Sequence, residues 1–133
     1  MKKNIFLILF FSLSSSAHMT LYDYAEIRFD FNFDKMDKST LIYITRKCYS
    51  LGTFAEEIGM TSAKEFGLEF GGGMLEIIQE TRPNLSLDER IELLNQEAYP
   101  LYVEYHHYWK KNKEDPELII SDLAFCQTLL DTF

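Results

Sequence analysis

The chain has 133 residues and a formal net charge of −8, with 47% hydrophobic and 26% charged residues. An acidic chain is a poor candidate for binding nucleic acid or anionic lipid, because phosphate groups are bound mainly by Lys and Arg. The length fits one small domain with its own core, and the charge favours a cationic partner.

The first 17 residues have the organisation of a secretory signal peptide. Lys2 and Lys3 precede an apolar run over 5–13, and small residues follow up to Ala17. The run is too short for a membrane-spanning helix, which needs about 20 residues, so no stable membrane anchor is expected. We expect cleavage after Ala17 and export, to the periplasm in a bacterium and otherwise as a secreted protein.

Apolar residues recur at helical spacing in four stretches of the remaining chain. Capping signals mark the starts: Asp37 or Ser39 for the first stretch, and Ser86 with Glu89 as a capping box for the third. Pro100 is expected to kink the third helix. The predicted helices cover 39–59, 62–82, 87–112 and 116–132. Short connections between them predict an all-α, antiparallel bundle of about four helices as one domain over 38–133.

Three consecutive glycines, Gly71, Gly72 and Gly73, interrupt the second predicted helix. Each costs about 1 kcal/mol of helix propensity relative to Ala, so a break or kink competes with a continuous helix. We favour the continuous helix, because the apolar pattern resumes in phase at Met74.

The segment over 18–37 is rich in aromatic residues, and its pattern fits more than one structure. Phe29, Phe31 and Phe33 alternate as on one face of a strand, whereas Tyr22, Phe29 and Met36 also belong to a helical pattern. We favour an extended segment packed on the bundle; a helix and an arm that binds a partner are the alternatives.

The same segment resembles the start of a calcium-binding loop, because Asp30, Asn32 and Asp34 alternate. The sixth and twelfth positions of such a loop require glycine and glutamate, and here they are Lys35 and Leu41. No calcium site is expected.

Cys48 and Cys126 are the only cysteines, and both fall on apolar helix faces. In an exported protein such a pair forms one intramolecular disulfide. We predict this bond between the first and last of the four helices, which are neighbours in a simple bundle.

A second aromatic cluster occupies the third predicted helix. Leu101 and Tyr105 belong to its core stripe, while Tyr99, Tyr102, His106 and Trp109 form another face. Tyr and Trp are typical of protein-binding hot spots. We favour the alternative that the aromatic N-terminal segment covers this face. The candidate partner-binding residues are Tyr99, Tyr102, His106, Trp109, Phe29, Phe31 and Phe33.

No catalytic, metal or cofactor motif is present. Adjacent His106 and His107 point about 100° apart on a helix, which does not suit a shared zinc ion. Glutamates at 65, 69, 76 and 80 share a helix face, and a carboxylate tuned by burial is the basis of one alternative, a small hydrolase.

A signal peptide, an acidic helical domain and one disulfide form an organisation similar to that of periplasmic immunity proteins of interbacterial toxins and of small periplasmic inhibitors or chaperones. We therefore expect an exported, non-enzymatic domain that binds another protein. A hydrolase and a periplasmic stress chaperone or structural module are the alternatives.

Overall fold

The computed structural model describes residues 19–60 and 63–132, which form five α-helices, one short 3₁₀ helix and no strand. The elements are α2 (Leu21–Phe29), η1 (Phe33–Lys35), α3 (Lys38–Glu57), α4 (Ala63–Thr81), α5 (Leu87–Lys111) and α6 (Glu117–Thr132). The all-α prediction is confirmed, and the four predicted helices begin and end within two residues of their predicted bounds. The predicted signal peptide lies outside the described residues.

The helix starts follow the capping signals in the sequence. The Asp37 carboxylate accepts the backbone N–H of Thr40 at 2.7 Å, and Ser86 and Glu89 form the complete capping box of α5. Asp115 accepts the backbone N–H of Glu117 at 3.0 Å, at the start of α6. These bonds satisfy donors that no helix can satisfy internally.

Helix α4 runs without interruption through its three glycines, as favoured. Two glycines at the contact between α3 and α4 are required by packing, one from each helix. An added Cβ on Gly52 of α3 would lie 2.6 Å from the Cα of Gly67, and one on Gly71 would lie 2.9 Å from the ring of Tyr49. The missing side chains therefore let the backbones of α3 and α4 approach closely.

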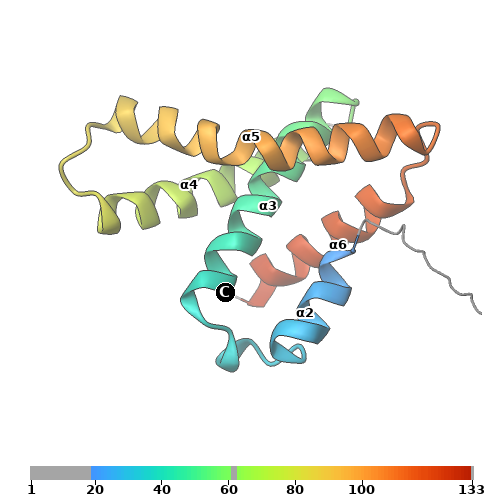
Figure 1. The fold of residues 1–133 in the computed structure, drawn as a ribbon, viewed down its shortest axis with the longest axis horizontal. Coiled ribbons are helices and arrows are strands. Elements are labelled where there is room, and N and C mark those ends of the chain that lie inside the picture. Colours follow the sequence, from blue (N-terminus) through green and yellow to red (C-terminus); the bar gives the residue numbers. More distant parts are fainter. Residues whose placement is uncertain (1–18, 61–62, 133) are drawn as a thin grey trace, which may run out of the picture.

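Helix α3 is the central element, and it packs against α4, α5 and α6. Figure 1 shows α4 and α5 as an antiparallel hairpin along the top of the molecule, with α6 and α2 side by side below it. The main core lies around α3, and a smaller cluster of Met74, Ile78 and Leu94 fills the hairpin. The fold is thus a helical bundle in which one helix contacts most of the others.

The favoured extended structure for the aromatic N-terminal segment is wrong, because its first part is helix α2. Thr20 caps this helix, and Leu21, Ala25 and Phe29 are buried where it packs on α6. A helix satisfies its own backbone hydrogen bonds, whereas a lone strand would leave them unpaired. The helix ends at Asp30 in the left-handed conformation.

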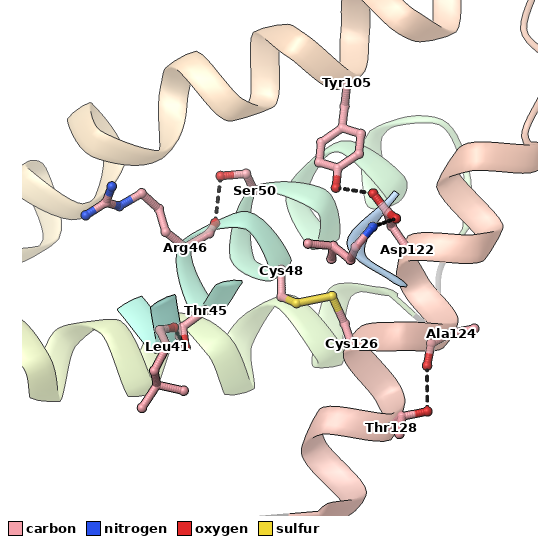
Figure 2. Close-up of a disulfide and its surroundings, with 11 residues drawn as sticks. Leu41, Thr45, Arg46, Cys48, Ser50, Tyr105, Asp122, Ala124, Cys126 and Thr128 are labelled. Atoms are coloured by element: carbon pink, nitrogen blue, oxygen red, sulfur yellow. Dashed lines mark hydrogen bonds between the residues drawn. A yellow bond between two sulfur atoms is a disulfide. The ribbon is translucent and has the colours of Figure 1, made fainter. Parts of the chain in front are cut away.

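The predicted disulfide between Cys48 and Cys126 is confirmed, and it joins α3 to α6 (Figure 2). The two Cα atoms are 5.9 Å apart, and both side chains are fully buried. The bond closes a loop with a sequence separation of 78 residues across the centre of the core.

Helix α5 continues through Pro100, which does not end it; the kink there stays a prediction. Leu101 and Tyr105, assigned to the core stripe of this helix, are both buried. The buried face of α6 includes Leu118, Asp122 and Phe125 as well as Cys126.

Candidate functional site: an aromatic groove between α3 and α5

The aromatic face predicted on α5 packs on one phenylalanine of α3. The rings of Tyr102, His106 and Trp109 meet the buried Phe54 ring edge-on, at centroid distances of 6.0, 6.2 and 6.1 Å. Helix α3 therefore covers the inner side of this face, in the place that we had assigned to the N-terminal segment. Tyr99 extends beyond the contact and is 64% exposed.

The exposed end of this face borders a cavity of about 320 Å³ between α3 and α5. Tyr99 and Tyr102 are stacked at its edge, with ring centroids 6.2 Å apart. The cavity, which we call the aromatic groove, is lined by Tyr49, Ser50, Thr53, Glu57, Asn95, Ala98, Tyr99 and Tyr102.

Polar contacts between the two helices hold the tyrosines of the aromatic groove in place. The Tyr102 hydroxyl donates to the Glu57 carboxylate, and this hydrogen bond is the main cause of a raised Tyr102 pKa. The Tyr49 hydroxyl donates to the Asn95 side chain at 3.0 Å. Deeper in, the Ser50 hydroxyl donates to the carbonyl of Ala98 at 3.0 Å. These hydrogen bonds fix the side chains that line the groove. Tyr99 is the one tyrosine of the groove that is largely exposed.

The other predicted binding residues lie on a different part of the molecule. Helix α2 and the residues after it lie at the lower edge of Figure 1, whereas α5 runs along the top. Phe29 is buried, Phe33 is half-buried against its ring at 5.4 Å, and Phe31 is 45% exposed. The structure therefore does not unite the two predicted aromatic sets in one surface.

A buried carboxylate at the centre of the fold was missed from the sequence. Asp122 of α6 is fully buried; one oxygen accepts the backbone N–H of Leu21 at 2.8 Å, and the other accepts the Tyr105 hydroxyl at 2.7 Å (Figure 2). Burial raises the pKa of Asp122, and the two hydrogen bonds oppose this shift. The pKa of Tyr105 is raised well above its ordinary value, first by burial.

Lys47 of α3 adds a cation beside this centre. Its ammonium donates to the Tyr43 hydroxyl at 3.4 Å, lies 3.9 Å from the Glu104 carboxylate and lies 5.3 Å from the ring centroid of Tyr105. Its positive charge lowers the pKa of Asp122. A cavity of about 150 Å³ borders Lys47, and the lining of this cavity does not include Asp122.

Both Asp122 oxygens accept hydrogen bonds inside the core, so this carboxylate connects α6 to α2 and to α5. The glutamates at 65, 69, 76 and 80 are exposed.

Within 19–60 and 63–132, no three His, Cys, Asp or Glu side chains are grouped to hold a metal ion. No helix in these ranges is long and apolar enough to cross a membrane.

Comparisons with protein-family models, with curated proteins and with solved structures find no match to this chain.

Proposed function

We propose that the chain is an exported, non-enzymatic domain that binds another protein through the aromatic groove. The observation that carries this proposal is Tyr99, which is 64% exposed although it is a large aromatic side chain stacked on a second one beside a cavity. Exposed tyrosines on a rigid support are typical of binding hot spots, since little side-chain entropy is lost when they are covered.

The surface next to the aromatic groove extends the apolar area. Ile91 and Leu87 lie about one and two turns before Asn95 of the groove on the same face of α5, and they are 40% and 56% exposed. Asp88 and Glu92 lie beside them. An apolar centre with an acidic rim suits a partner that is apolar at its contact and positively charged around it.

The disulfide supports export, because such bonds persist in oxidising compartments. An immunity or inhibitor-type role, in which a small acidic domain neutralises a cationic protein, is the function that we assign to this organisation. A hydrolase has less support among the described residues, since Asp122, the carboxylate with a raised pKa, is fully buried and lines neither the aromatic groove nor the cavity beside Lys47.

Site-specific photocrosslinking tests the proposal. A photoreactive phenylalanine derivative replaces Tyr99 in one variant and Ile120 in a matched control, because Ile120 is a similarly exposed residue on α6. Expressed in the native producer, the variant at 99 is expected to crosslink one defined protein, and the control is not. Equal crosslinking at both positions, or none at 99, would contradict the proposal.

Purification of the crosslinked partner then allows a quantitative test. Tyr99→Ala is expected to weaken the complex by about 30-fold or more, the effect of losing a hot-spot residue, while Ile120→Ala changes the affinity by less than twofold. Both side chains are largely exposed, so the thermal unfolding midpoint should stay within about 2 °C of wild type in each case.

A further inference from the structure

We propose that a second groove, between α4 and α6, binds a cationic amphipathic helix of a partner protein. This groove, which we call the acidic groove, has a volume of about 840 Å³. Its floor is apolar and is formed by Phe66 and Phe70 of α4 and Leu129 of α6. Leu41 and Thr45 of α3 also line it. It shares no lining residue with the aromatic groove, so the two grooves are separate.

The rim of the acidic groove carries three carboxylates from α4. Glu65, Glu69 and Glu76 are all exposed, and neither Lys nor Arg lines the groove. No ion pair within the described part of the chain involves any of the three. Their spacing puts them on one side of the helix over about 17 Å. An apolar floor beside an unneutralised acidic row is complementary to a ligand with one apolar face flanked by Lys or Arg.

The glycines of α4 supply an independent observation. A Cβ on Gly73, which lines the acidic groove, would have only the Thr45 methyl group within 4 Å, at an ordinary contact distance of 3.8 Å. A Cβ on Gly72 would meet nothing. Unlike Gly71, neither residue is required by packing inside the chain, yet each weakens the helix by about 1 kcal/mol relative to Ala. The missing side chain at Gly73 keeps the groove wall open for an occupant.

The helices that line the acidic groove favour a helical ligand over an extended one. Helices α4 and α6 have no unpaired backbone edge, so an extended peptide would gain no main-chain hydrogen bonds there. A helix instead binds through side chains alone, and about 12 residues match the length of the acidic row. Anionic lipids and acidic peptides are disfavoured by the same carboxylates.

A defined peptide tests this inference without knowledge of the natural partner. The probe is a fluorescent amphipathic helix of about 14 residues built from Leu and Lys, and its binding to the oxidised chain is followed by anisotropy. Two matched peptides serve as controls: Leu with Glu, and Ser with Lys. We expect measurable binding of the Leu–Lys peptide alone, with affinity that falls as salt rises. Equal binding of either control peptide would overturn the inference.

Substitutions then locate the binding. Gly73→Leu fills the acidic groove with a better helix former, so it should reduce affinity at least tenfold without lowering the unfolding midpoint. Gly72→Leu, the same change one residue away in open space, should leave affinity within twofold. Glu69→Lys should also reduce affinity at least tenfold and flatten its salt dependence, whereas Glu92→Lys on α5 should not. Unchanged binding in Gly73→Leu and Glu69→Lys would contradict the proposed site.

The Tyr99→Ala variant separates this inference from the proposed function. Peptide affinity should be unchanged in Tyr99→Ala. If Tyr99→Ala abolishes peptide binding and Gly73→Leu does not, the peptide occupies the aromatic groove, so the present inference is wrong while the proposed function stands.

Discussion

The two ends of the molecule are held together in different ways. At the lower end in Figure 1, α2, α6 and the middle of α3 are tied by the Cys48–Cys126 disulfide and by the hydrogen bonds of Asp122. The outer part of the α4–α5 hairpin depends on a small apolar cluster and a capped turn. We call these regions the tied half and the hairpin. The exposed Tyr99 lies on α5 between Leu94, which belongs to the small cluster, and Tyr105, which donates to Asp122.

Loss of the disulfide is expected to have the largest effect on stability. In the chain-entropy model, a closed loop of this length contributes about 4 to 5 kcal/mol to the free energy of unfolding. The Cys48→Ala/Cys126→Ala variant should lose most of this amount in urea unfolding, and reduction of the wild type should have a similar effect. A loss below about 1 kcal/mol would mean that packing alone holds the tied half.

Removal of the buried carboxylate should rank second. Asp122→Ala leaves the Leu21 N–H and the Tyr105 hydroxyl without an acceptor in the core, at a cost of about 3 kcal/mol. Tyr105→Phe removes one donor only and should cost about 1 to 2 kcal/mol. Equal effects of the two substitutions in urea unfolding would show that the hydrogen bond from the Leu21 N–H to Asp122 contributes nothing to stability.

Asp122 should also give the tied half a distinctive pH dependence. Its folded-state pKa is raised above 3.8, so the folded state binds the proton more tightly than the unfolded state. The carboxyl group therefore favours folding most at low pH, and stability falls as pH rises through its folded pKa. Asp122→Asn should abolish this contribution, so the difference in unfolding free energy between variant and wild type should depend on pH only in that window. A difference that is constant with pH would contradict the assignment.

The hairpin should respond to loss of packing at Leu94, which is 3% exposed in the small cluster with Met74 and Ile78. Leu94→Ala should cost about 2 to 3 kcal/mol, because it removes buried methyl groups and leaves a cavity. The exposed Leu87 on the same helix provides the control, since Leu87→Ala should change the unfolding free energy by less than about 0.5 kcal/mol. Similar losses for both substitutions would mean that the cluster is not a packed core.

Glycine substitutions give the smallest and most discriminating effects. Gly52→Ala would place a Cβ 2.6 Å from the Cα of Gly67 and should destabilise the protein by about 1 to 3 kcal/mol. Gly72→Ala meets no neighbour and should stabilise it by up to about 1 kcal/mol. If thermal unfolding gives both substitutions the same sign, the close approach of α3 and α4 is wrong.

Patterns local in the sequence predicted much of this fold. Four amphipathic stripes and their caps predicted four helices, and two cysteines on such stripes predicted the disulfide. The segment around Phe29 fitted two periodicities, and its helix was decided by burial of Leu21 and Ala25 against α6, a contact that the local pattern does not contain.

The sites were less predictable, because they depend on how the helices cross. Tyr99 and Tyr102 were identified by residue type, but the groove beside them is formed with α3. Asp122 was overlooked because a charged residue is rarely buried. Its position, four residues after Leu118 and four before Cys126, was the available signal. The acidic groove is lined by residues of α3, α4 and α6, which are far apart in the chain.

Native-state hydrogen exchange on the oxidised protein tests the division between the tied half and the hairpin most directly. We predict that the slowest amides lie in the middle of α3 and α6, around Cys48 and Cys126, and that amides beside the 82–86 turn of the hairpin exchange faster. The slowest amides in the outer hairpin, with faster exchange around the disulfide, would contradict the account.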